Sequence, residues 1–197
     1  MSHVQITGAL LIATFVWQFL GFARIGDPRS PRPTRFIGRI FLFTLILLYG
    51  YWLFAGVLLV MQKTAILHAT AFVYGQAGLA RGSGLLLFVA GNILLASTRP
   101  PLGRSLQMPT TLPRDGNTLA TNGPYRFIRH PIYVADILLA LGLGLIVGSW
   151  IFPALGVVVA ILLPGIVAAE EKDLAARFGE SWSAYSRRTA RVLPGIW

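Results

Sequence analysis

Residues 131–169 read PIYVADILLALGLGLIVGSWIFPALGVVVAILLPGIVAA and contain a single charged residue, Asp136. Within this stretch, residues 131–149 and 151–169 are two apolar runs, each close to the ~20 residues that an α-helix needs to cross a bilayer core. Because only Trp150 separates them, we expect two membrane-spanning helices packed as an antiparallel hairpin. Small residues that allow such helices to approach closely recur in both runs: Gly142, Gly144, Gly148 and Gly156.

The composition of the whole chain has the same character. Of its 197 residues, 55% are hydrophobic and 12% are charged, whereas soluble domains carry about 25% charged residues. The mean hydropathy is +0.66. These values exclude a soluble enzyme, a disordered chain and a collagen-like fibre. The absence of cysteine excludes disulfide scaffolds, thiolate zinc sites and cysteine nucleophiles. We predict an all-α, polytopic membrane protein.

Two runs near the N-terminus, residues 4–23 and 36–61, are also long enough to span. Residues 65–80 and 83–97 are shorter and carry polar side chains, so hydropathy alone does not decide whether they cross.

The distribution of basic residues decides between these possibilities. All but two of the 17 Lys and Arg residues fall in the first loop, in the loop after Ser97 or in the C-terminal tail. If only residues 83–97 cross, all three clusters face one side, as the positive-inside rule expects of the cytoplasmic side. We therefore expect five transmembrane helices, with the N-terminus outside, the C-terminus cytoplasmic, and residues 65–80 interfacial or re-entrant. The net charge of +10 then indicates an anionic membrane surface rather than nucleic acid.

The first candidate for chemistry is the loop before residue 131. Asn122-Gly123-Pro124 is typical of a turn, and Pro131 suits the first turn of a helix. Arg129 and His130 then lie at a helix N-terminus, whose partial positive charge and free N–H groups bind anions such as carboxylates. Two aromatic faces flank this position, those of Tyr125 and Tyr133. The alternative is that these residues only anchor the helix at the interface.

The second candidate is the acidic pair Glu170-Glu171, directly after the last apolar run. These carboxylates could pair with Arg126 or Arg129, or could bind a cationic group of a ligand. Farther along, hydrophobic residues recur every three or four positions and predict a cytoplasmic amphipathic helix that covers the loop as a lid: Leu174, Phe178, Trp182 and Tyr185.

Three other polar residues are less informative. Asp136 lies inside a span, where a carboxylate is costly, and both a functional role and pairing with an arginine are open. His3 and His68 have no partner at the spacing of a metal site, so we expect no metal.

The loop and the tail together resemble the isoprenylcysteine carboxyl methyltransferase family of integral membrane enzymes that use S-adenosylmethionine. The broader group includes phospholipid N-methyltransferases. The resemblance covers about residues 82–194, and its motifs are, in chain order, Asn117-Thr118-Leu119-Ala120, Gly123-Pro124-Tyr125, Arg129-His130-Pro131-Ile132-Tyr133, Glu170-Glu171, Phe178-Gly179-Glu180 and Leu193-Pro194. It implies one membrane domain, residues 1–197, with a methyltransferase core at 82–197 preceded by helices and a connecting segment at 1–81.

The resemblance also implies a site for S-adenosylmethionine beneath the tail. The expected cofactor-binding residues are Asn117, Thr118, Leu119, Ala120, Tyr125, His130, Pro131, Ile132, Tyr133, Glu170 and Glu171, and the expected catalytic residue is Arg129. A helix N-terminus with His130 suits a carboxylate, Glu170 suits an amino group or ribose hydroxyls, and tyrosines suit adenine or a sulfonium. Methyl transfer needs positioning and exclusion of water more than a strong acid or base.

The departures from the family pattern concern mainly the substrate half of the site. Asn117 replaces a histidine, and Ala135-Asp136 stands where a glycine is common. Trp182 replaces a tyrosine, and Ile166 stands where the eukaryotic enzymes carry an arginine associated with the prenylcysteine carboxylate. We therefore expect a membrane lipid or another lipophilic acceptor, bearing a carboxylate, amine or thiol, rather than specifically a prenylated protein.

Two alternatives remain open. One is an NADPH-dependent reductase, because sterol reductases share a similar Arg-His-Pro-x-Tyr ending. The other is a non-catalytic membrane protein such as a small transporter or assembly factor.

Overall fold

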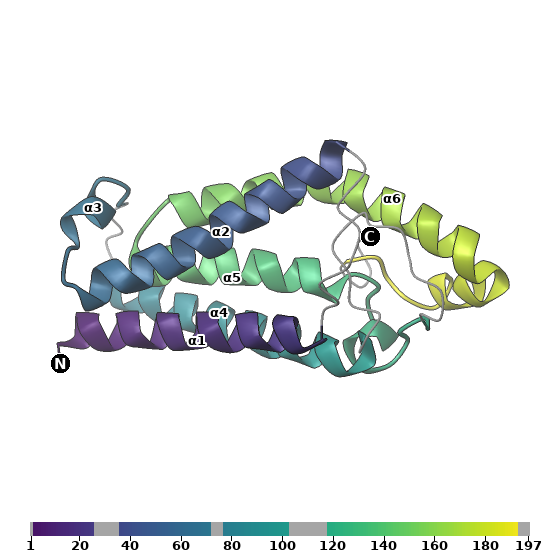
Figure 1. Ribbon diagram of the computed structural model, residues 1–197, viewed down its shortest axis with the longest axis horizontal. Helices are drawn as coiled ribbons and strands as arrows, with labels where there is room; N and C mark the ends of the chain where they lie inside the picture. The colour runs from purple at the N-terminus through teal and green to yellow at the C-terminus, as the bar shows by residue number, and fades with distance from the viewer. Residues whose placement is uncertain (1, 26–35, 72–76, 103–117, 193–197) are drawn as a thin grey trace.

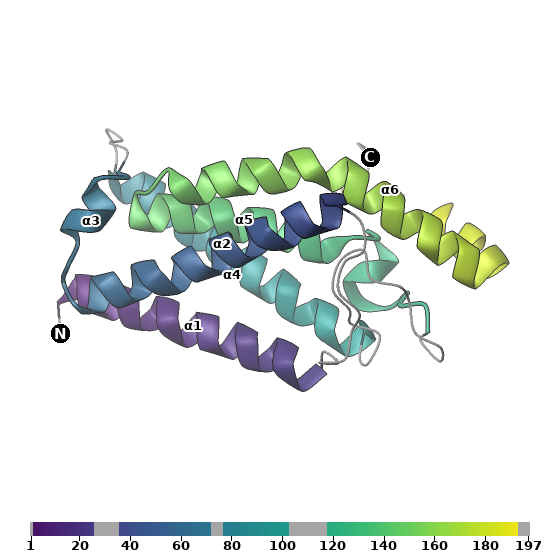
Figure 2. The same ribbon diagram turned by 45° about the horizontal axis from the view of Figure 1, so that its top comes forward.

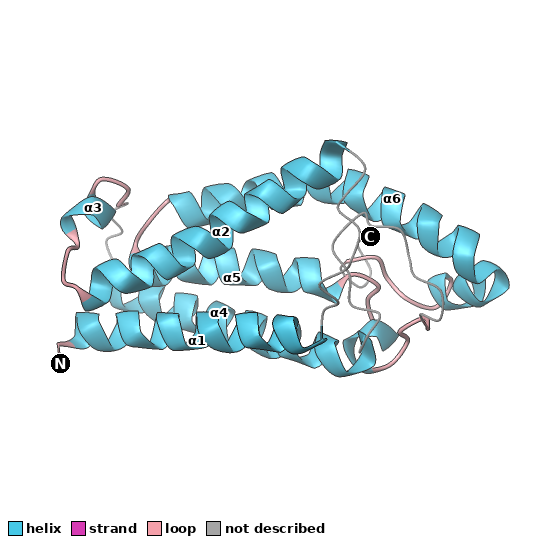
Figure 3. Cartoon of the chain, viewed as in Figure 1, coloured by secondary structure: helices cyan, strands magenta, loops and turns pink. Residues whose placement is uncertain are grey.

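A bundle of long helices makes up most of the protein. The computed structural model describes residues 2–25, 36–71, 77–102 and 118–192. Figure 1 shows that these residues form five long helices, namely α1 (His3–Ile25), α2 (Phe36–Val60), α4 (Ala77–Leu102), α5 (Pro131–Val147) and α6 (Ile151–Ser186). Two single turns are added, α3 (Ala65–His68) and the 3-10 helix η2 (Gly123–Arg126). The described part contains helices and loops but no strand (Figure 3), so the predicted all-α membrane fold is confirmed.

The lengths of the helices match the expected number of spans. Within the described residues, four stretches are long and apolar enough to cross a membrane: His3–Leu20, Phe36–Val60, Gly78–Leu102 and Ile151–Ser186. Helix α5 is apolar but has 17 residues, at the lower end of the range that spans a bilayer. Helix α6 has 36 residues and is ~54 Å long at 1.5 Å per residue. It therefore extends well beyond a hydrocarbon core of ~30 Å, and we take its spanning part to be residues 151–169.

The predicted hairpin between α5 and α6 is present. Helix α5 ends at Val147 and is capped by Gly148, which has a φ of 75° in the left-handed region that favours glycine. The amide of Gly148 donates to the carbonyl of Gly144 at 2.8 Å and closes the last turn. Helix α6 begins at Ile151 and returns alongside α5 (Figure 2).

The segment 65–80 does not form a helix across the bundle. Its described residues are the single turn α3, the following residues up to Ala71, and residues 77–80, which belong to the start of α4. Thr70 fixes the first part, because its hydroxyl lies 2.9 Å from that of Ser149 and 3.0 Å from that of Tyr51. The spanning helix predicted at 83–97 is longer in the structure, where it runs over Ala77–Leu102. The prediction began too late because the first turns of the helix are rich in glycine and low in hydropathy.

Glycines set the closest approaches between helices. A Cβ at Gly142 would lie 2.6 Å from the amide nitrogen of Phe88 and 2.8 Å from the carbonyl oxygen of Gly84. Gly142 was expected to face the hairpin partner α6, and it packs on α4 instead. Within the hairpin, the close contacts come from Gly144 against Pro153 and from Gly156, where an added Cβ would lie 2.9 Å from that of Ala140.

The two ends of the bundle differ in charge. One end, called the site end, holds η2, the start of α5 and the part of α6 that extends past the bundle (Figure 1). The described members of the three basic clusters lie there. The opposite end, called the far end, holds the N-terminus and α3, and its basic residues are Lys63 and Arg81. The described members of the basic clusters thus share one end, as the loop charges predict.

Candidate functional site

The C-terminal tail folds back beside the loop that precedes α5. The turn is made at Gly179, where α6 is interrupted by a φ of 50°. The tail then forms a short parallel pairing with the loop, in which the amides of Arg129 and His130 donate to the carbonyls of Ala190 and Arg191 at 2.8 and 3.1 Å. The amide of Ala190 donates in turn to the carbonyl of Phe127 at 3.1 Å. This pairing places residues 190–191 against the start of α5.

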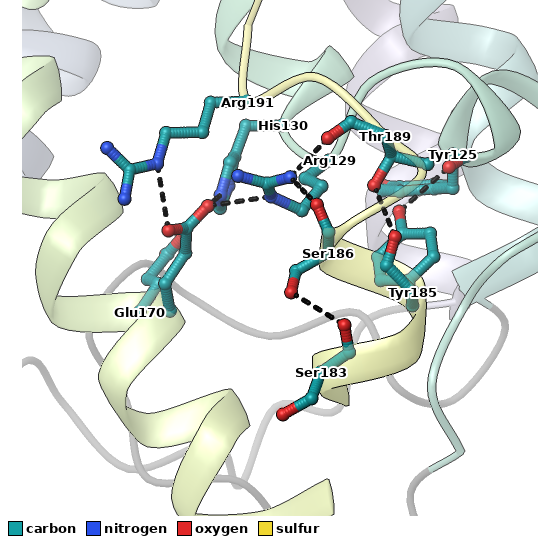
Figure 4. A network of polar contacts seen from close by, with 10 residues as sticks. Tyr125, Arg129, His130, Glu170, Ser183, Tyr185, Ser186, Thr189 and Arg191 are labelled. Atoms are coloured by element: carbon teal, nitrogen blue, oxygen red, sulfur yellow. Dashed lines mark hydrogen bonds and ion pairs between the residues drawn. The ribbon is translucent and has the colours of Figure 1, made fainter. Parts of the chain in front are cut away.

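Arg129 ties the loop, α6 and the tail together (Figure 4). Its Nε donates to Glu171 Oε1 at 2.8 Å, and its Nη1 donates to the carbonyl of Ser186 at 2.7 Å and to the carbonyl of Thr189. The second oxygen of Glu171 accepts from Arg191 Nε at 3.0 Å. Only 9% of the Arg129 side chain and 12% of the Glu171 side chain are exposed, so the ion pair is nearly buried.

Glu170 is held by a different set of groups. Its Oε1 accepts from the hydroxyl of Tyr133 at 2.6 Å, and its Oε2 lies 3.4 Å from His130 Nδ1. The rings of His130 and Tyr133 are nearly parallel, with centroids 5.9 Å apart. His130 Nε2 is buried and has no hydrogen-bond partner among the described residues, although it lies 3.5 Å from Glu171 Oε1. This nitrogen and the partly open Glu170 carboxylate are the groups available to a ligand.

Aromatic residues of α6 cover the loop as the amphipathic pattern predicts. Trp182 and Tyr185 are buried, at 6% and 5% exposure. The hydroxyl of Tyr185 donates to the carbonyl of Tyr125 at 2.8 Å, and the guanidinium of Arg129 lies 5.9 Å from the centre of the Trp182 ring. The end of α6 is therefore packed on η2 rather than lying free.

Most of the predicted site residues come together. Tyr125, Arg129, His130, Tyr133 and the acidic pair form one cluster, as described above. Pro131 begins α5 and is buried, and Ile132 packs between the two hydrophobic cores of the bundle. Thr118, Leu119 and Ala120 precede η2, and within the described chain no hydrogen bond or ion pair joins them to this cluster. Asn117 lies outside the described residues.

Several contacts were not predicted. Arg191 pairs with Glu171, a contact that the basic tail allowed but that depends on the turn at Gly179. The predicted pairing of the acidic residues with an arginine involves Arg129, whereas the guanidinium of Arg126 lies over the Phe127 ring. Asp136, only 2% exposed, accepts from the hydroxyl of Tyr49 at 2.8 Å and is thus paired with α2.

The electrostatics of the cluster favour a charged His130. Burial alone lowers the pKa of His130, because it disfavours the imidazolium, but the contacts with Glu170 and Glu171 outweigh burial and raise the pKa above its ordinary value of 6.5. Burial also raises the pKa of the Tyr125 phenol, as do the nearby Tyr185 and Glu170, so this hydroxyl stays neutral.

A pH dependence of stability follows from the raised pKa of His130. In the folded state the groups around its imidazole are Glu170, Glu171, Tyr133 and Arg129. Because the folded pKa exceeds the unfolded one, the stabilisation is fully present below about pH 6.5 and is lost as the pH rises through the folded value. We expect the thermal midpoint of the protein in detergent, measured relative to that of His130→Gln, to fall as the pH rises above 6.5. His68→Gln is the control and should keep the wild-type profile. A wild-type advantage that grew with pH would contradict this assignment.

A comparison of the sequence with known families shows which family this chain belongs to. Residues 79–181 match the phospholipid methyltransferase family. The chain belongs to this family. The matched stretch runs from the start of α4 to the lid portion of α6, and it contains the whole Glu170–Glu171 pair together with its partners on α5.

Three relatives show similarity to part of the chain. The cobalt-zinc-cadmium resistance protein CzcN of Cupriavidus metallidurans is 40% identical over 84 residues, which are 42% of this chain and 38% of that protein. The nickel-cobalt-cadmium resistance protein NccN of Alcaligenes xylosoxydans xylosoxydans is 34% identical over 84 residues, 42% of this chain and 39% of the relative. The protein-S-isoprenylcysteine O-methyltransferase of Schizosaccharomyces pombe is 28% identical over 116 residues, 58% of this chain and 49% of the relative. The matches thus cover less than half of each relative.

The family match and the isoprenylcysteine O-methyltransferase relative confirm the family resemblance that the sequence motifs indicated. The chain is a membrane methyltransferase-family protein similar to isoprenylcysteine methyltransferases. Two of the relatives are named for metal resistance. Within the described residues, no group of three or more His, Asp or Glu side chains could hold a metal ion.

Proposed function

We propose that this protein transfers a methyl group from S-adenosylmethionine to a lipophilic acceptor drawn from the bilayer. The observation that carries the proposal is the convergence of the α5 N-terminus, His130 and the Glu170 carboxylate beneath a folded-back tail. Membership of the phospholipid methyltransferase family and the similarity to an isoprenylcysteine O-methyltransferase support it. We further propose residues 82–197 as the catalytic core, with residues 1–81 supplying helices that pack against it.

The residues of the cluster fit the chemistry of this cofactor. His130 Nε2, the orphaned buried nitrogen, and the first N–H groups of α5 suit the carboxylate of its methionine part. Glu170, with 22% of its side chain exposed, suits the amino group or the ribose hydroxyls. Tyr125 and Tyr133 offer aromatic faces to a sulfonium or to adenine. Pro131, Ile132 and Thr118–Ala120 are retained as the proposed walls of this site, together with Asn117.

The work of the protein in this reaction is positioning and exclusion of water. When bound, the cofactor supplies a sulfonium methyl group that an in-line nucleophile displaces. Holding the reacting groups in line and keeping water away supplies most of the rate enhancement of such a transfer. Trp182 and Tyr185 are proposed to close the loop side of the site, and their burial supports a role in excluding solvent. A strong acid or base is not needed.

Arg129 is proposed to act as a positioning residue. Among the described residues, its side chain donates to Glu171 and to two carbonyls, at the end of α6 and in the tail. These contacts support a role in fixing the tail over the site. We also propose, from the loop charges, that the site end faces the cytoplasm and the N-terminus faces the opposite side.

Binding measured by calorimetry on the detergent-purified protein tests the proposal. We expect S-adenosylmethionine and its demethylated product to bind, and Glu170→Gln to weaken binding about 10- to 100-fold, the effect of losing a charge-assisted hydrogen bond. Glu180→Gln is the control, because Glu180 is exposed and lies beyond the cluster. NADPH is titrated in parallel. Binding of NADPH alone would favour a reductase, and a folded protein that binds none of the three would refute the enzyme proposal.

A further inference from the structure

A cavity lies between α1 and α4 at the far end of the bundle, away from the methyltransferase site. Its volume is about 730 Å³, and its lining comes from α1, α4, the ends of α2 and α5, and the α3 segment. Leu10 and Leu85 form its outer edges and are 61% and 55% exposed. The cavity therefore opens sideways between the two helices, toward the lipid that surrounds a membrane protein.

Helix packing explains why this gap exists. Gly8 brings α1 against α2, because a Cβ at this position would lie 2.7 Å from the carbonyl oxygen of Gly56. Gly84 brings α4 against α5 in the same way, with Gly142 O only 2.9 Å from its added Cβ. Since each helix is drawn to a different neighbour, α1 and α4 separate at this end. The views in Figures 1 and 2 show the two pairs of helices.

The α3 segment forms a fixed wall of the gap at the far end. Four residues of this segment line the cavity: Thr64, Leu67, His68 and Ala71. This segment is attached to the bundle by the hydroxyl cluster around Thr70 described above, and the amide of Trp150 donates to the carbonyl of Thr70 at 3.0 Å. The cavity is thus built from anchored elements.

A second cavity, of about 550 Å³, continues along the same two helices and shares Phe88 with the first. It reaches Trp17 on α1 and Ser97 on α4. Asn92 lines it and accepts a hydrogen bond from Gln18 Nε2 at 2.7 Å. From His3 to Trp17 the groove follows ~21 Å of helix. That distance exceeds the ~15 Å thickness of one leaflet of the hydrocarbon core, so the groove can take an extended acyl chain.

The charge at the mouth of the groove has one sign. Arg81, His3 and His68 line the first cavity. Arg81 is exposed and makes no hydrogen bond or ion pair with any described residue. The described residues that form the far end, 2–10, 57–71, 77–88 and 142–155, include no Asp or Glu. A phosphate placed at this mouth would therefore meet cations and hydrogen-bond donors and no opposing carboxylate.

We propose that this groove binds one anionic phospholipid from the leaflet at the far end. Its phosphate lies at Arg81, with His3 and His68 as further donors, and one acyl chain lies between α1 and α4 as far as Trp17. The lipid fills a gap that neither helix pair closes, and so joins α1–α2 to α4–α5. The site is separate from the cluster at Glu170, and the inference does not depend on the proposed methyl transfer.

Tryptophan quenching in vesicles tests the site. The full chain is reconstituted in phosphatidylcholine containing a small fraction of either brominated phosphatidylglycerol or brominated phosphatidylcholine, and the Trp17 signal is obtained by difference from Trp17→Phe. We expect the brominated anionic lipid to quench Trp17 preferentially. Arg81→Gln should reduce that preference about fivefold, the usual contribution of one basic residue at an anionic surface. Lys63→Gln is the matched control, because Lys63 is an exposed base at the same end that does not line the groove.

Each other result overturns the inference. Equal quenching by the two brominated lipids would mean that Trp17 contacts only bulk bilayer lipid. If Arg81→Gln and Lys63→Gln reduced the preference for the anionic lipid equally, the preference would come from the overall positive charge of the far end and not from a site at Arg81. As an independent readout, phosphatidylglycerol should raise the thermal midpoint of the wild-type protein in detergent and not that of Arg81→Gln, since a ligand bound only to the folded state stabilises it. Equal stabilisation of both proteins would also overturn the proposal.

Discussion

Replacing Arg129 with methionine is expected to lower the free energy of unfolding by about 3–5 kcal/mol, the usual cost of removing one partner from a buried ion pair. Methionine keeps much of the volume of the side chain but leaves Glu171 as a nearly buried charge that retains only Arg191 and His130 nearby. The carbonyls of Ser186 and Thr189 lose their donor as well. The tail should therefore detach from the loop before α5.

Thermal unfolding and limited proteolysis of the detergent-solubilised protein check this expectation. Arg129→Met should show a lower midpoint and rapid cleavage after residue 182, where the tail begins to cover η2. Arg187→Met is the control, because Arg187 is exposed and its side chain makes no hydrogen bond or ion pair with the part of the chain that the structure describes. Arg129→Lys should fall between the two, since lysine keeps the charge but cannot donate in several fixed directions at once. A stable, protease-resistant Arg129→Met would show that the backbone pairing alone holds the tail.

The contrast between Arg129 and its neighbours shows what could be predicted from the sequence. A helix N-terminus at Pro131 and an acidic pair at the end of the last span are local features, and the hairpin between them brings them to the same end. That the loop and the acidic pair lie close together was predicted on that basis, and the grouping of His130, Tyr133 and Glu170 was predicted from the family resemblance. The sequence did not predict which carboxylate pairs with which cation, because the pairing depends on the reversal at Gly179 and on the register of the tail beside residues 127–130.

Helix partners were harder to predict than helix positions. Apolar runs and loop charges are read along the chain, so the five helices and their shared basic end could be predicted. The face that each glycine presents depends on the rotation of each helix, which hydropathy does not specify when the whole surface is apolar. Gly142 therefore packs on α4 rather than on α6, and Asp136 accepts a hydrogen bond from Tyr49 of α2 rather than pairing with an arginine.

The contact between α4 and α5 leads to the second large effect that we expect. A Cβ at Gly84 would lie 2.6 Å from the Cβ of Leu145 and 2.9 Å from the carbonyl oxygen of Gly142. A backbone atom cannot move aside as the end of a side chain can, so Gly84→Leu must force the two helices apart. We expect it to destabilise the protein by about 3 kcal/mol, the upper part of the range for overpacking a tight core.

Gly82, two residues earlier on the same helix, is the matched control, because nothing lies within 4 Å of a Cβ at that position. Gly82→Leu should leave the protein as stable as the wild type or raise its stability by up to about 1 kcal/mol, since glycine is a poor helix former. Both variants add the same apolar side chain to α4, so thermal unfolding in one detergent compares them directly. If Gly84→Leu lowers the thermal midpoint and Gly82→Leu keeps or raises it, backbone proximity rather than hydropathy positions α4 against α5. Equal midpoints would mean that α4 can shift on α5 without cost, and the close glycine contact would then have no role in holding these two helices together.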